Sequence, residues 1–209
     1  MLFEASHAPK SATISAGGGE LSCKDNYWHA LVQPPIGRGT GIHSITFKIT
    51  KGNAACVGMG APSQDMGEVI GFDLDNSVGL KSNGYLNANK SVVRVGVESY
   101  TTGDEVRVEC DSSTGTVSWY INGVKVAEWT GVGDGWHFAV GGWQGTTAFA
   151  IVGSSAAATP APPAQVQQAM CVWGVGEIGV VERGGHRRNG KWSGGIVTMG
   201  MAARPQADE

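Results

Sequence analysis

Apolar and polar residues alternate most regularly between Gly103 and Trp129. Two runs in this stretch place an apolar residue at every second position, first Val106, Val108 and Cys110, then Val117, Trp119 and Ile121. A period of two puts alternate side chains on opposite faces of a β-strand. The pattern therefore predicts neighbouring strands, each with one apolar and one polar face.

The segments between these runs have the composition of turns. Asp111–Gly115 is rich in residues that favour reversing loops. Asn122-Gly123 is the dipeptide that best tolerates the two positive φ angles of a type I′ hairpin turn, and a third strand, Val124–Trp129, follows it. Three antiparallel strands with one apolar face need a second layer to cover them. We therefore predict a β-sandwich.

Shorter alternating segments predict the other strands. They are residues 21–32, 42–50, 54–60, 93–97 and 136–152, the last divided by a glycine-rich loop at 141–145. We expect Val57 and Met59 to point inward, and short strands with loops within 65–89. The chain then divides into an N-terminal arm at 1–20, a sandwich at 21–153, an Ala/Pro-rich linker at 154–169, and a β-like extension at 170–209 that docks on the sandwich or on a partner.

The central stretch also carries an ordered motif. Gly103-Asp104 precedes a strand that ends in Asp111, and residues 115–123 read Gly-Thr-Val-Ser-Trp-Tyr-Ile-Asn-Gly. This order and spacing resemble SPRY (B30.2-like) domains, and the resemblance covers about residues 21–153. One departure is Lys48-Ile49, where the family usually has Glu-Val. The resemblance implies an all-β, two-layer antiparallel sandwich of the concanavalin-like type that acts as a non-catalytic protein-interaction module.

Composition limits the classes of partner. Glycine accounts for 33 of 209 residues, against a usual share of about 7%, which fits a chain with many turns. The net charge of −3 gives no global case for binding nucleic acid or an anionic membrane. Charged residues make up only 16% of the chain, compared with about 25% in typical domains. We expect part of the surface to be uncharged and covered by a partner.

Cysteine usage and hydropathy point to an intracellular protein, with the cytoplasm as the expected compartment. The four cysteines, Cys23, Cys56, Cys110 and Cys171, show no metal-site spacing, so we expect them to be buried and reduced. No segment approaches the ~18 consecutive apolar residues of a membrane-spanning helix. We expect no membrane insertion and no cofactor.

Acidic residues near position 70 raise the question of glycan hydrolysis. Glu68, Asp73 and Asp75 are close in sequence, and a retaining glycosidase needs two carboxylates about 5–5.5 Å apart. The E-x-D-x-E strand of the sandwich enzymes is missing, and no calcium-binding loop is recognisable. We therefore expect solvated turn carboxylates and a protein that is not an enzyme.

Aromatic loop residues are the strongest candidates for a binding site. In SPRY proteins that bind short peptides, a Trp-Gly in the last long loop helps to form the pocket, and Trp143 resembles that tryptophan, although Gln144 precedes Gly145 here. A core position for Trp143 is an equally good interpretation. The predicted partner-binding residues are Trp143, Gln144, Gly145, Trp136, Tyr100 and Tyr85.

Three functions remain open at this point. The first is an accessory or scaffold subunit of a multi-subunit assembly that binds a peptide or a neighbouring subunit through loops at the sandwich edge. The second is a carbohydrate-binding or glycan-acting sandwich, because exposed indoles also stack on sugars. The third is an RNA-contacting subunit of a ribonucleoprotein, with Arg187, Arg188 and Lys191 in the basic segment 184–191 as the candidate phosphate contacts.

Overall fold

The computed structural model describes residues 1–63 and 65–156. The chain divides into two units, Met1–Gln165 and Val166–Glu209, and every described residue belongs to the first. Three expected features lie outside the described residues: the linker beyond residue 156, the extension at 170–209, and the basic residues Arg187, Arg188 and Lys191. They stay predictions.

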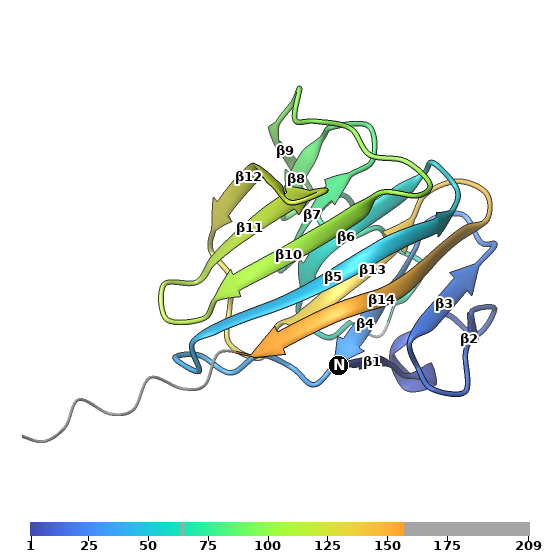
Figure 1. Cartoon of the computed structure of the whole chain (residues 1–209), viewed down its shortest axis with the longest axis horizontal. Helices are drawn as coiled ribbons and strands as arrows, with labels where there is room; N and C mark the ends of the chain where they lie inside the picture. The colour runs from blue at the N-terminus through green and yellow to red at the C-terminus, as the bar shows by residue number, and fades with distance from the viewer. Residues whose placement is uncertain (64, 157–209) are drawn as a thin grey trace, which may run out of the picture. The chain divides into compact units, whose positions relative to one another are not determined.

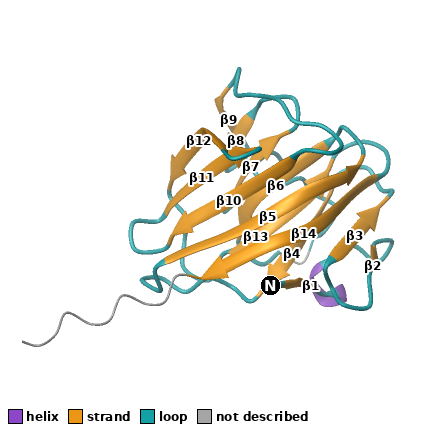
Figure 2. Ribbon diagram, viewed as in Figure 1, coloured by secondary structure: helices purple, strands orange, loops and turns teal. Residues whose placement is uncertain are grey.

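The described residues form two seven-stranded antiparallel sheets that pack face to face, as Figure 1 shows. The front sheet has the order β12-β11-β10-β5-β14-β3-β2, made of Val124–Thr130, Thr116–Ile121, Glu105–Asp111, Ile42–Lys51, Thr147–Ala156, Glu20–Cys23 and Thr13–Ile14. The back sheet has the order β1-β4-β13-β6-β7-β8-β9, made of Leu2–Phe3, Trp28–Gln33, His137–Gly142, Ala55–Gly60, Ser77–Lys81, Leu86–Ala88 and Ser91–Arg94. A single short 3₁₀ turn, η1 at Ala5–His7, is the helical element among these residues (Figure 2). The predicted two-layer β-sandwich is confirmed.

The central hairpins form as their sequence predicts. β10 pairs with β11, which places Val108 opposite Trp119, and β11 pairs in turn with β12. Asn122 and Gly123 both have positive φ angles, 48° and 86°, as a type I′ turn requires. The turn residues and the alternation therefore set the register of this part of the front sheet.

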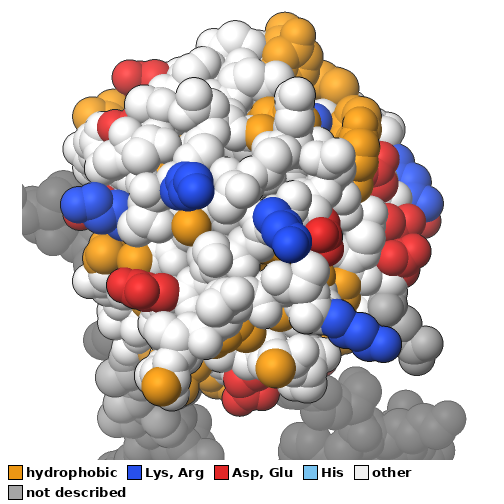
Figure 3. All heavy atoms as spheres, turned by 90° about the vertical axis from the view of Figure 1, so that its right-hand side faces the viewer, with side chains coloured by type: hydrophobic (Ala, Val, Ile, Leu, Met, Phe, Trp, Pro, Cys, Tyr) orange, Lys and Arg blue, Asp and Glu red, His pale blue; other side chains and the backbone are white. Residues whose placement is uncertain are grey.

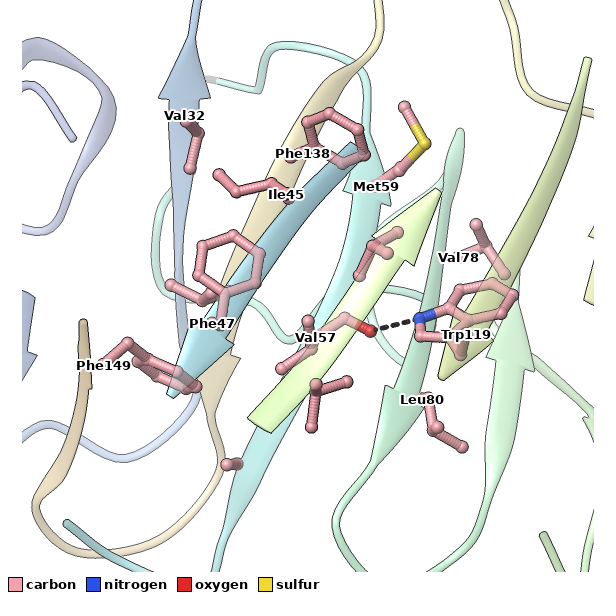
Figure 4. Close-up of a cluster of buried hydrophobic side chains, with 14 of the residues drawn as sticks. Val32, Ile45, Phe47, Val57, Met59, Val78, Leu80, Trp119, Phe138 and Phe149 are labelled. Atoms are coloured by element: carbon pink, nitrogen blue, oxygen red, sulfur yellow. Dashed lines mark hydrogen bonds between the residues drawn. The ribbon is translucent and has the colours of Figure 1, made fainter. Parts of the chain in front are cut away.

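The core is closed by side chains from both sheets, and Trp119 lies toward one side of it, near Val78 and Leu80 (Figure 4). The indole of Trp119 is fully buried, and its Nε1–H donates to the backbone oxygen of Val57 at 2.9 Å. This bond joins β11 of the front sheet to β6 of the back sheet. Phe47 and Phe149 fill the neighbouring part of the core and meet edge to face, with ring centroids 6.4 Å apart. As expected, Val57 and Met59 point inward.

The ends of the sandwich extend beyond the range taken from the sequence. Residues 2–3 and 13–14, within the expected arm, form β1 and β2 at the edges of the two sheets. At the other end, β14 continues to Ala156, and its last residues Ser154 and Ser155 pair with Ile45 and Ser44 of β5. The first residues of the expected linker are therefore part of a strand.

The strand expected at 93–97 is shifted and shorter. β9 spans Ser91–Arg94 and forms an edge of the back sheet, with Val93 46% exposed. Gly96 then takes a positive φ of 71°, which ends the extended run, and only beyond it does Val97 reach the core. An alternating apolar pattern does not distinguish a buried strand from an edge strand without a facing layer.

Three of the four cysteines lie among the described residues. Cys23, Cys56 and Cys110 are buried and free, as expected for reduced thiols, and Cys171 lies outside the described residues. No helix among residues 1–63 and 65–156 is long and apolar enough to cross a membrane.

Trp119→Phe should destabilise the protein because it removes the donor that joins the two sheets and leaves a void beside the Val57 carbonyl. We expect the free energy of unfolding to fall by about 2–4 kcal/mol in urea denaturation. The matched control is Tyr120→Phe on the opposite face of β11, which loses only a half-buried hydroxyl bond to Glu109 and should cost about 1 kcal/mol or less. Equal losses in the two variants would contradict the role given to the inter-sheet bond.

Candidate binding site on the back sheet

The outer face of the back sheet has few side chains at its centre. The pairing registers set Ala139, Gly58, Gly79 and Asn87 side by side in one row across the sheet. A Cβ on Gly79 would lie 2.5 Å from the Cys56 sulfur and 2.9 Å from the Ile70 carbonyl oxygen. Glycine is required there because the backbone of another segment lies directly on the strand.

That covering segment comprises residues 66–74. Its residues Val69 and Ile70 pack against Leu31, Cys56 and Ala139 on the outer face, where they form a second apolar cluster. The segment is also tied down by hydrogen bonds. The Cys56 thiol donates to the Ile70 oxygen at 3.6 Å, and the His29 amide donates to the Met66 oxygen at 3.1 Å. The back sheet therefore has a packed layer on its outer face as well as on its inner face.

Trp143 completes this outer cluster from the β13–β14 loop. Its side chain is half-buried and packs against the cluster around Ile70. The loop backbone is fixed on both sides, because Trp143 N–H donates to the Ala54 oxygen at 3.2 Å and Gly145 N–H donates to Asn26 Oδ1 at 3.1 Å. Trp143 is thus neither a residue of the main core nor a freely exposed indole.

Lys81 lies between two aromatic rings at the edge of this cluster. Its Nζ is 4.0 Å from the centroid of the Phe72 ring and 4.5 Å from that of Trp143. The residue is only 9% exposed, while Phe72 is 41% exposed. We call Phe72, Lys81, Tyr85 and Trp143 the aromatic–lysine cluster.

The β7–β8 register places Tyr85 on the same face as Lys81. Leu80 pairs with Leu86 and both enter the core. The next pair is Lys81 and Tyr85, and the Lys81 amide donates to the Tyr85 backbone oxygen at 2.8 Å. Because side chains alternate along a strand, both residues of this pair face outward. Tyr85 is 42% exposed. Gln144 and Gly145, beside Trp143, are exposed as well.

Two residues predicted to contact a partner are buried instead. Tyr100 is 4% exposed, and its hydroxyl donates to the carbonyl oxygen of Leu80 at 2.7 Å, with the carbonyl oxygen of Ala55 also within reach at 3.0 Å. Trp136 is 5% exposed and stacks on Trp129, with ring centroids 6.1 Å apart. Each ring is used in packing the sandwich and is almost fully buried in this structure, and contact of either with a partner stays an untested prediction.

The sequence interpretation also missed Phe72 and Lys81. In the sequence, the segment Gly71–Asp75 is notable for its carboxylates. Lys81 ends an alternating strand and has no unusual residue beside it. Only the fold brings the two together, because residues 66–74 cross the outer face next to β7. A local signal was present in Gly79, whose missing side chain indicates a close backbone approach.

The candidate carboxylates serve the local structure. Asp73 Oδ2 accepts the Val69 amide at 3.4 Å, and Asp75 pairs with Lys90 at 2.8 Å. Across the described part of the chain, no group of three or more His, Cys, Asp or Glu side chains could hold a metal ion. These observations give no support to a paired-carboxylate site.

Two buried histidines are held in the neutral form. His29 is fully buried, and its Nδ1 lies 2.8 Å from the Glu68 oxygen, so Nδ1 carries the proton. Within the described residues its Nε2 has no partner, and burial lowers the pKa of His29 below its usual 6.5. Burial also lowers the pKa of His137, and His7, stacked on it at 5.8 Å, lowers it further.

Stability should therefore fall under mild acid. Both pKa values are lower in the folded than in the unfolded state, so the stabilisation is complete above pH 6.5 and is lost as the pH falls below it. The expected slope is up to about 1.4 kcal/mol per pH unit for each histidine, measured by urea denaturation between pH 7 and 5. His29→Asn should make this slope shallower. An unchanged slope in that variant would show that His29 does not titrate as its burial requires.

Comparisons with known proteins support the fold. No protein-family model matches the chain, and no curated protein is significantly similar to it in sequence. Solved structures do match. The SPRY domain of human HERC1 aligns with a TM-score of 0.60 at 18% identity, over 72% of this chain and 98% of that one.

Two further structures agree. A human SPRY domain gives a TM-score of 0.55 at 16% identity, over 68% of this chain and 94% of the other. The PSpry domain of TRIM65 gives 0.59 at 12% identity, over 73% and 91% of the two chains. At such identities the likeness concerns the backbone, and it agrees with the motif at residues 103–123. The described part of this chain therefore has the β-sandwich fold of SPRY domains.

Proposed function

We propose that this protein is a non-catalytic protein-interaction module that binds a peptide or a neighbouring subunit on the outer face of its back sheet. The observation that carries the proposal is the aromatic–lysine cluster. Phe72 and Trp143 both contact Lys81 there, Tyr85 follows Lys81 on the same face, and all three aromatic side chains are partly accessible to solvent. Tryptophan and tyrosine are enriched among the residues that contribute most binding energy at protein interfaces.

The backbone around Trp143 is suited to this role because it is ordered before any partner arrives. The hydrogen bonds from Trp143 to Ala54 and from Gly145 to Asn26 fix the loop. The layer of Val69 and Ile70 beneath it fixes the indole. Ordering loops and side chains costs free energy on association, so a surface that is already ordered binds more tightly for the same contacts.

The surface chemistry fits a protein partner better than a polyanion. Figure 3 looks onto the right-hand side of Figure 1, an edge of the sandwich, where uncharged side chains and backbone predominate and charged side chains lie in small groups. The net charge of −3 also disfavours a general electrostatic attraction to nucleic acid. SPRY domains typically act in protein interactions, and an accessory or scaffold role in a larger assembly follows from that use of the fold.

Trp143→Ala should remove the central aromatic contact and reduce partner recovery while the sandwich stays folded. The full chain, its Trp143→Ala variant and a Val124→Ala control would be compared by quantitative affinity purification from the source cells. Val124 is 61% exposed but lies on β12 at the edge of the front sheet. We expect specific proteins to be depleted about tenfold or more with Trp143→Ala, as for a binding hot spot.

The control should recover the same proteins as the unchanged chain. Candidates lost only with Trp143→Ala would then be purified and tested for direct binding by calorimetry. Identical partner sets for all three proteins would contradict the proposed surface.

A further inference from the structure

Lys81 carries a charge into a nearly enclosed position without a counter-ion. The residue is 9% exposed, yet the ion pairs found among the described residues all involve other cations, namely Lys90, Arg107 and Lys125. Its ammonium also makes no hydrogen bond to a described residue. An ammonium has three N–H donors and no acceptor, and no described residue accepts a hydrogen bond from them.

The nearby groups cannot neutralise this charge. Cys56 is opposite Lys81 on the neighbouring strand, but burial raises the pKa of its thiol to about 12, so it is neutral at physiological pH. Among the described residues, neither Asp73 nor Asp75 forms an ion pair with Lys81, since Asp73 accepts the Val69 amide and Asp75 pairs with Lys90. The rings of Phe72 and Trp143 attract the ammonium, although such contacts are worth only about 0.5–2 kcal/mol.

We propose that Lys81 is the anchor for a carboxylate of the partner, held between the Phe72 and Trp143 rings on the outer face of the back sheet. This inference rests on the proposed function and specifies its partner as an acidic peptide segment. The bound carboxylate accepts hydrogen bonds from the ammonium, while the neighbouring aromatic faces cover the methylene groups or backbone beside it. Hydrogen bonds with both partners ionised are among the strongest in proteins.

The geometry favours a carboxylate over a phosphate group. The site offers one ammonium, which balances one carboxylate, whereas phosphate carries up to two negative charges and is usually recognised by clustered arginines. Lys90, in the adjoining β8–β9 hairpin, is already paired with Asp75. A carboxylate can come from an Asp or Glu side chain or from a chain terminus, and both share this chemistry.

A peptide-display selection tests the inference without a known partner. Random dodecapeptides would be selected on the full chain, and enriched sequences would be synthesised in three forms: unchanged, with the acidic residue replaced by its amide, and with an amidated C-terminus. Their affinities would be measured by fluorescence polarisation. The two modified forms distinguish a side-chain carboxylate from a terminal one, and neither alters the folding of the protein.

The protein variants are Lys81→Met, Lys81→Arg, Trp143→Ala and the Val124→Ala control. We expect enriched peptides to share a carboxylate, and its loss or Lys81→Met to weaken binding by about tenfold or more. Lys81→Arg keeps the charge and should retain binding within a few fold, and Val124→Ala should have no effect.

The outcomes separate this inference from the proposed function. Peptides that depend on Trp143 but bind equally well to Lys81→Met, or that lack any carboxylate preference, would overturn the anchor role and leave the binding surface intact. Binding that is insensitive to Trp143→Ala as well, or no enrichment at all, would overturn both.

Discussion

The hydrogen bond from Trp119 to the Val57 carbonyl fixes how the two sheets face each other. It comes from β11, next to the edge strand β12 of the front sheet, and ends on β6, the strand between β7 and β13 in the back sheet. The large indole and its single buried donor can be satisfied together only when β11 lies over β6 in one register. Within the back sheet, the β13–β6–β7 registers then place Lys81 at the end of β7 and Trp143 just after β13.

The outer face of the back sheet is shaped by strand positions that have no side chain. Glycines at 58, 79 and 141 leave the surface flat, so residues 66–74 can lie directly on it and bring Phe72 to Lys81. A sheet face that is normally solvated thereby becomes a second packed layer, with a cation enclosed at its margin. Packing, rather than any sequence motif, creates the aromatic–lysine cluster.

The sequence predicted the parts of the fold that depend on local chemistry. Alternation and the Asn122-Gly123 turn were sufficient for β10, β11 and β12, because strand period and turn geometry are encoded within a few residues. It could not predict whether an aromatic ring near a loop turns inward. Tyr100 and Trp136 resemble Trp143 in sequence context, yet their rings fill the core. Contacts between segments distant in the chain decide this, as they decide the meeting of Phe72 with Lys81.

The central claim is that a partner covers the aromatic–lysine cluster. Site-specific photo-crosslinking in the source cells tests this most directly, with benzoylphenylalanine placed at Phe72 in one protein and at Val124 in another. Both side chains are exposed, at 41% and 61%, but Phe72 lies in the segment over the back sheet, whereas Val124 is on β12 of the front sheet. The account predicts a discrete crosslinked protein from position 72 and none from position 124. Crosslinking at 124 alone, or at neither position, would contradict it.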